Sequence, residues 1–268
     1  MYNRSSRALQ SRQMRNKACG WLFAISLTMR AGTAGQLPDQ GQLARFQEKI
    51  RRDMTSIPNY TCLETIERGR RVWPLDQDFI AGGTVRLEVS IVAGKELFAR
   101  PGAGSFEERD VASLVPTGAI GTGMFAAFAR DLFIKGKGTL RYRREENLNG
   151  RGSDRYDFRL TQQESALKLE VGNISATVAA KGSFWFDPVS LDLIRLDVYG
   201  DNMPKEMHLA EAVTRTNYAR THVGDSDALL PKRSELTMTS FSGITYRDVI
   251  EFSQCHEYRA ESTISFGH

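Results

Sequence analysis

Gly121–Ala126 is the stretch whose residue types come closest to a cofactor-binding motif. It reads G-T-G-M-F-A and matches the G-x-G-x-x-A pattern that holds dinucleotide phosphates at the start of a helix. That chemistry requires a strand before the glycines, a βαβ unit around them and an acidic residue about 20 positions later. The chain that follows alternates as antiparallel strands do. We therefore interpret the motif as a glycine-rich turn before an amphipathic helix, and we expect no cofactor.

Gly224, Asp225 and Ser226 are similar to the nucleophile block of one class of lipid esterases. Those enzymes carry this block near the start of an α/β chain and need an Asp-x-x-His pair near its end. No aspartate stands three residues before any histidine here, and no G-x-S-x-G elbow is present. Residues 224–228 are interpreted as a polar turn.

The four histidines, His208, His222, His256 and His268, are not spaced as metal ligands require, and no H-E-x-x-H motif occurs. His256 follows Cys255, which would suit a thiol–imidazole couple. However, neighbours in a strand point to opposite faces and cannot easily share a proton. We expect neither a metal site nor a catalytic cysteine.

Two pairs of adjacent carboxylates, Glu107-Glu108 and Glu145-Glu146, could in principle serve acid–base chemistry. Glycoside hydrolysis needs two carboxyl groups held across a cleft, which adjacency does not supply. Adjacent carboxylates in a loop or strand are usually solvated. No catalytic residue is therefore predicted, and an unrecognised hydrolase is the last of the functional alternatives.

Residues 1–35 have the three parts of a secretory signal peptide. The first part contains Arg4, Arg7, Arg12, Arg15 and Lys17 and no acid, and a short apolar run and small residues follow. The apolar run is shorter than the roughly 20 residues that span a bilayer. An uncleaved N-terminal anchor is the alternative. The chain is expected to be exported to the periplasm or the cell exterior, with no transmembrane segment after cleavage.

Export changes the meaning of the net charge of +4. The leader holds six basic residues and no acid, so residues 36–268 keep 30 basic and 32 acidic side chains. A nucleic-acid partner is therefore not expected. The same removal leaves two cysteines, Cys62 and Cys255. In an oxidising compartment such a pair is a candidate disulfide, and two buried free thiols are the alternative.

Residues 36–268 are predicted to form a single, mostly β domain. A helical stripe, Leu43, Phe46, Ile50 and Met54, opens it. After Pro58 the apolar period changes to two, which indicates strands with one buried face. Roughly nine or ten such strands imply a sheet large enough to curl.

One insertion, residues 105–134, breaks the strand pattern. Its apolar residues Phe125, Phe128, Leu132 and Phe133 are spaced as one helical stripe. A sheet face needs covering, and this segment and the N-terminal helix are the available covers. The predicted fold is α+β: a large curved antiparallel sheet, or open half-barrel, whose concave face is covered by the N-terminal helix and the inserted helical segment.

Four stretches, Ile57–Arg68, Gly118–Phe133, Gly182–Leu196 and Val249–Phe266, resemble a family of uncharacterised exported bacterial proteins. The resemblance covers most of residues 40–266 and brings no known activity. A more distant resemblance, on the Asp-Pro hairpin at Phe184–Leu196 and the helix before the sheet, is to outer-membrane lipoprotein-sorting (LolA-like) proteins. It implies a half-barrel whose members bind acyl chains or protein partners. No ligand-binding residue of that family can be placed here.

The leading hypothesis is an exported protein that holds an apolar, lipid-like ligand or a lipoprotein in a half-barrel cavity. Phe125 and Phe128 would form its lid. The expected lining consists of Val85, Leu87, Val89, Ile91, Tyr142, Tyr156, Phe158 and Leu160. These residues could equally pack together as ordinary core. The first alternative is an envelope protein–protein interaction or stress-sensing module without a small ligand.

Overall fold

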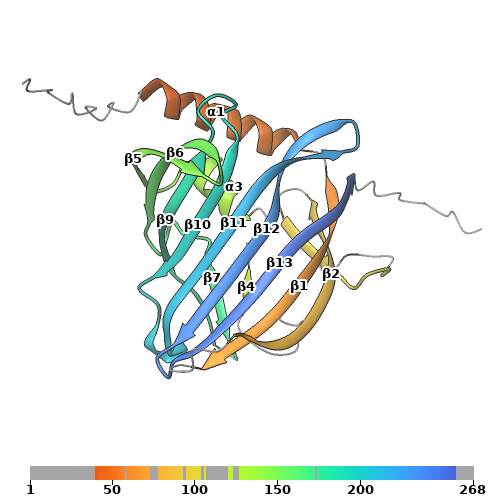
Figure 1. Cartoon of the computed structure of the whole chain (residues 1–268), viewed down its shortest axis with the longest axis vertical. Coiled ribbons are helices and arrows are strands. Elements are labelled where there is room, and N and C mark those ends of the chain that lie inside the picture. The colour runs from red at the N-terminus through yellow and green to blue at the C-terminus, as the bar shows by residue number, and fades with distance from the viewer. Residues whose placement is uncertain are drawn as a thin grey trace, which may run out of the picture. The chain divides into compact units, whose positions relative to one another are not determined.

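Ten strands of this protein form one long antiparallel sheet that curls over two helices (Figure 1). The computed structural model describes residues 40–57, 59–72, 78–92, 95–103, 106, 120–122, 127–172 and 174–257. They all belong to one compact unit, Leu37–His268. The expected signal peptide and Phe125 lie outside the described residues.

The main sheet has ten strands in the order β3-β2-β1-β13-β12-β11-β10-β9-β6-β5. Neighbouring strands of this sheet pair in the antiparallel sense. Because β3 and β5 stand at the two ends of this order, the sheet is an open half-barrel, as predicted. The strand bounds are β1 Tyr60–Val72, β2 Ile80–Val92, β3 Lys95–Ala99, β5 Thr139–Leu148, β6 Arg151–Leu160, β9 Ala179–Phe186, β10 Leu193–Asp201, β11 Leu209–Val223, β12 Ser226–Ser240 and β13 Ile244–Glu257.

The remaining elements are few and short. A second sheet has the order β4-β7-β8 and is made of β4 Ile120–Thr122, β7 Lys168–Val171 and β8 Ile174–Thr177. Within the described residues, the helices are α1 Gln40–Ser56, α3 Ala127–Phe133 and the 3-10 helix η1 Lys205–Met207. None of the helices in the described part of the chain is long and apolar enough to cross a membrane.

Helix α1 forms where the sequence predicts it, and its apolar stripe is the face that it buries. Phe46 and Ile50 are fully buried, and Met54 is nearly so. The ring of Phe46 stacks on Phe186 at 4.3 Å and meets Phe133 of α3 edge-on at 5.4 Å. Both α1 and α3 thus cover the inner face of the half-barrel through aromatic side chains.

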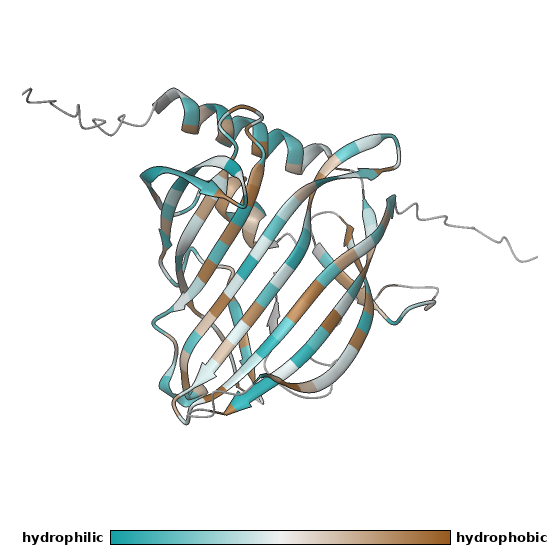
Figure 2. Ribbon diagram, in the orientation of Figure 1, coloured by the Kyte–Doolittle hydropathy of each residue, from teal (hydrophilic) through white to brown (hydrophobic). Residues whose placement is uncertain are grey.

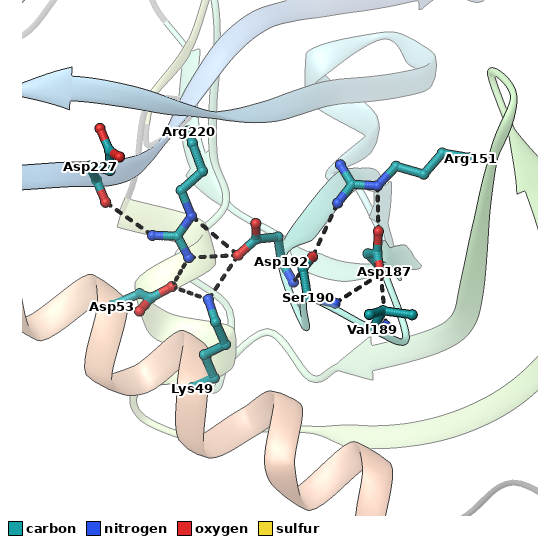
Figure 3. Close-up of polar contacts among 9 residues, drawn as sticks. All are labelled: Lys49, Asp53, Arg151, Asp187, Val189, Ser190, Asp192, Arg220 and Asp227. Atoms are coloured by element: carbon teal, nitrogen blue, oxygen red, sulfur yellow. Dashed lines mark hydrogen bonds and ion pairs between the residues drawn. The ribbon is translucent and has the colours of Figure 1, made fainter.

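Charged residues hold α1 to the strands (Figure 3). Lys49 donates hydrogen bonds to Asp53 at 2.6 Å and to Asp192, in the β9–β10 turn, at 2.8 Å. Arg220 of β11 donates to the same two carboxylates. Four side chains from three elements therefore form one network at the end of the sheet.

The predicted Asp187–Pro188 turn joins β9 to β10. The Asp187 carboxylate accepts hydrogen bonds from the backbone N–H groups of Val189 and Ser190, at 2.7 and 3.0 Å. Arg151 donates to its other oxygen at 2.6 Å (Figure 3). This is how a short polar side chain stabilises a tight turn.

Hydropathy alternates along the long strands, as Figure 2 shows. The buried residues fall into two groups. We call the first the α1–α3 cluster. Besides the helix side chains it contains Tyr156, Phe158, Leu160, Phe184 and Phe186. We call the second the β1–β2 cluster, and it contains Tyr60, Cys62, Ile66, Leu87, Val89, Ile91, Val223, Ala228, Leu230, Ile250 and Phe252.

Cys62 and Cys255 are joined by a disulfide, as their number and the inferred compartment suggested. The bond connects β1 to β13, which are neighbours in the sheet although 193 residues apart in the chain. The pairing register shifts between Thr61 and Leu63, and Gln254 has a positive φ of 51°. Such an extra residue in one strand is a β-bulge, which changes the direction of the neighbouring side chains.

Candidate binding site on the inner face of the sheet

Glu64 stands out on the inner face of β1. Every second residue at the start of β1 is buried: Tyr60, Cys62, Glu64 and Ile66. Residues of equal parity in a strand point to the same side, so Glu64 points inward with its apolar neighbours. Leu87 lies opposite it on β2 and Phe252 on β13. A carboxyl group is thus held among hydrophobic side chains.

The surroundings of Glu64 keep its carboxyl group neutral. The side chain is 6% exposed, and its Oε2 atom has no hydrogen-bond partner. Burial raises the pKa of Glu64 from 4.5 to about 8, and the nearby charge of Glu96 contributes to the rise. At pH 7 the group is therefore mainly a protonated acid, which can both donate and accept a hydrogen bond.

Four further polar groups, Tyr60, Glu96, Arg130 and Tyr218, interact in the region around Glu64. Burial raises the pKa of Tyr60, and the charges of Glu96 and Tyr218 raise it further, whereas Arg130 lowers it. Burial and Glu96 also raise the pKa of Tyr218. Glu96 on β3 therefore acts on residues of both β1 and β11, which are far apart in the strand order.

The curl of the sheet explains how one charge reaches both strands. Charges act strongly only over short distances, so Glu96 must lie near Tyr60, Glu64 and Tyr218 together. From the helical side, Arg130 of α3 approaches Tyr60 and donates to the backbone oxygen of Met54 at 2.9 Å. We call Tyr60, Glu64, Glu96, Arg130 and Tyr218 the inner polar cluster.

The residues predicted to line a cavity are divided between the two apolar clusters. Leu87, Val89 and Ile91 belong to the β1–β2 cluster, with Val85 packed at its border. They therefore lie on the same half of the sheet as Glu64.

The other predicted lining residues belong to the α1–α3 cluster. Tyr156, Phe158 and Leu160 are buried in it, with Tyr142 packed at its border. Tyr156 stacks on Phe184 at 5.5 Å, and Phe158 contacts the expected lid residue Phe128, whose ring centroid is 5.9 Å away. Side chains of α1 and α3 occupy the space over these strands. This half resembles ordinary core.

The inner polar cluster was not recognised from the sequence. The one local signal in the sequence is Glu64. It is an acidic residue on a face of its strand where the neighbouring residues are apolar. Its partners come from β3, α3 and β11, and no spacing in the sequence relates them. The cluster contains one neutral carboxylic acid, two phenol groups, one carboxylate and one guanidinium group. These groups lie beside the apolar side chains of the β1–β2 cluster.

The described residues contain no group of three or more His, Cys, Asp or Glu side chains placed to hold a metal ion. His222 lies 3.1 Å from Asp227, but both side chains are exposed at a hairpin end. His256 contacts the backbone oxygen of Gln254. The arrangement of the inner polar cluster favours binding of an amphipathic molecule.

No protein-family model matches the chain. No curated protein matches it either. Among solved structures, the chain is similar to a LolA superfamily protein from Nitrosomonas europaea, with 13% identity and a TM-score of 0.39 over 82% of this chain and 94% of that one.

Two further solved structures are similar at the same level. An outer membrane lipoprotein-sorting protein domain from Vibrio parahaemolyticus shares 13% identity, with a TM-score of 0.43 over 79% of this chain and 90% of that one. A DUF1329 family protein from Desulfovibrio piger shares 15% identity, with a TM-score of 0.42 over 82% and 95%. The names of the Nitrosomonas and Vibrio proteins are those of the family to which the sequence showed a distant resemblance.

Proposed function

We propose that the chain is an exported binding protein that holds a lipid-like amphiphile against the β1–β2 half of its inner face. The acyl chain of a free lipid or of a lipoprotein would lie along Leu87, Val89 and Ile91. Its polar group would hydrogen-bond with the inner polar cluster. Export is part of the proposal and is supported by the leader-like residues 1–35 and by the Cys62–Cys255 bond.

The observation that carries this proposal is the state of Glu64. Leaving a buried polar group without a hydrogen bond costs about 1–3 kcal/mol, so proteins seldom keep one without a reason. The Oε2 atom of Glu64 has no hydrogen-bond partner among the residues that the structure describes. A ligand hydroxyl, amide or ester group would satisfy it. Apolar neighbours on both adjacent strands would hold the attached hydrocarbon.

Native mass spectrometry is the first test. The chain, produced with its leader and purified from an oxidising compartment without detergent or reductant, is expected to carry a mass excess. That excess should disappear on organic extraction. A bare polypeptide mass, lower by two hydrogen atoms because of the disulfide, would overturn the carrier function if the extracted protein also failed to bind a fatty-acid probe. The chain would then be assigned as an interaction module.

A pH titration locates the ligand. Binding of 11-(dansylamino)undecanoic acid to the extracted protein is expected to weaken as the pH rises through about 8, because Glu64 loses its proton there. Glu64→Gln keeps a neutral hydrogen-bonding group and should flatten this decline. Glu67→Gln, on the exposed face of the same strand, is the matched control and should keep it. Equal pH profiles for all three proteins would place the ligand elsewhere.

A further inference from the structure

A shallow groove of about 540 Å³ lies on the opposite, outer face of β5, β6 and β9. Its lining is rich in cations and contains a single carboxylate, Asp157. The cationic side chains are Arg141, Arg143, Arg155, Arg159 and Lys181. Because inner and outer residues alternate along each strand, this groove is separate from the inner polar cluster.

The acids near the groove neutralise only part of this charge. Asp157 accepts hydrogen bonds from Arg143 at 2.5 Å and Arg155 at 3.3 Å, and also from Ser183. Lys181 pairs with Asp201 at 3.0 Å.

Two cations of the groove remain unneutralised. Arg141 and Arg159 are exposed, and within the described part of the chain neither has an acidic partner within 4 Å. The groove therefore carries excess positive charge at its open side.

The placement of these charges is unfavourable for the fold itself. Arg159 on β6 pairs directly with Lys181 on β9, and like charges opposite each other destabilise a sheet. Charge on β5 alone would be explained by its position at the sheet edge, where it prevents pairing with other chains. However, β6 and β9 are interior strands. The cations on these two strands call for a different reason.

We propose that this groove binds the phosphate headgroups of an anionic lipid surface. Guanidinium groups match phosphate oxygens in geometry as well as charge. The cations are spread over three adjacent strands, about 10 Å across, and do not converge on one point. A spread array suits a surface of many phosphates better than a single small anion. Groups of four to eight basic residues are the usual size for such contacts.

Vesicle sedimentation tests this inference. The wild-type protein, in the form the cell exports, should bind vesicles of phosphatidylglycerol and phosphatidylcholine at about 0.1 M salt and ignore phosphatidylcholine alone. Each cation near an anionic surface contributes about five-fold in affinity. The double variant Arg141→Gln/Arg159→Gln should therefore bind about 25-fold more weakly. Both side chains are exposed, so the fold should be unaffected.

The control is a second double variant that also removes two positive charges, but at positions outside the groove. Arg52 on α1 and Lys232 on β12 are exposed, and the double variant Arg52→Gln/Lys232→Gln should lose less than about three-fold. Equal losses in both double variants, or no binding by the wild type, would overturn the proposal. Release by inorganic phosphate at constant ionic strength would also overturn it, because the groove would then be a small-anion site.

Discussion

The two halves of the inner face are built in different ways. Over β6 and β9, aromatic rings from α1, α3 and the strands interlock, and Phe46 is fully buried among them. Over β1 and β2, the inward residues include Glu64, whose Oε2 atom has no hydrogen-bond partner in the described part of the chain, and Tyr60, whose pKa is raised by burial. The first half is packed with aromatic rings, whereas the second also buries an unfavourable polar group that a ligand could satisfy.

The largest effect on stability should come from a substitution in the α1–α3 cluster. Phe46→Ala removes a ring that stacks on Phe184 and Phe186 and meets Phe133 edge-on. Loss of burial and the remaining cavity should lower the free energy of unfolding by about 3–5 kcal/mol, measured by urea denaturation. Phe241→Ala is the control, because Phe241 is 70% exposed, and it should change stability by less than about 0.5 kcal/mol. Similar losses for both variants would contradict the burial of Phe46 in the α1–α3 cluster.

Reduction of the disulfide should have the next largest effect. The bond closes a loop of 193 residues, and removing such a bond lowers stability by about 2–5 kcal/mol. Urea midpoints with and without dithiothreitol measure the difference. The double variant Cys62→Ala/Cys255→Ala should be insensitive to the reductant. Insensitivity of the wild type would mean that the bond does not form.

Glu64 should make the unliganded protein less stable in alkali. Its pKa rises from 4.5 to about 8 on folding, so the folded state holds its proton more tightly. Stability from this group is complete below pH 4.5 and is lost progressively up to about pH 8. Glu64→Gln removes the titration and should be more stable than wild type by roughly 2–4 kcal/mol at pH 8.5, but not at pH 4. Parallel stability curves for the two proteins would contradict the burial of Glu64.

The smallest effect should come from the network at the end of α1. Although burial raises the pKa of Asp192, hydrogen bonds from Arg220 and Lys49 lower it overall. The ion pairs of Asp192 contribute their full stabilisation at a pH above the ordinary pKa of an aspartate. This contribution is lost as the pH falls through the lowered pKa of Asp192. Asp192→Asn should lower unfolding free energy by about 1 kcal/mol at pH 7. The exposed Asp225→Asn should leave it unchanged in the same thermal unfolding experiment.

Local patterns were sufficient for α1, for a helix in the 105–134 insertion and for the strand character of the chain, but they did not predict η1. The stripe from Leu43 to Met54 predicted α1, because apolar residues at steps of three or four form one apolar face only when the segment is a helix. The same stripe predicted which face of the helix is buried. Alternation from Val85 to Ile91 and from Tyr156 to Leu160 predicted β2 and β6. The same alternation indicated which residues face inward, but it could not distinguish packed core from cavity lining.

The candidate sites depend on pairings that no local pattern encodes. Glu64, Glu96 and Tyr218 come from three strands that approach one another only because the sheet curls. The outer groove likewise needs β6 to pair with β9. In the sequence these two strands are separated by β7 and β8, which belong to the small sheet.

From the sequence alone came a curved antiparallel sheet, its two helical covers and a cysteine pair suited to a disulfide. These follow from residue periodicity and count, which act over a few neighbouring positions. Only the tertiary structure decided which apolar residues are covered by α1 and α3 and which surround Glu64. The physical reason is that burial and electrostatic contact depend on distance in space, and strand order sets that distance between residues far apart in the chain.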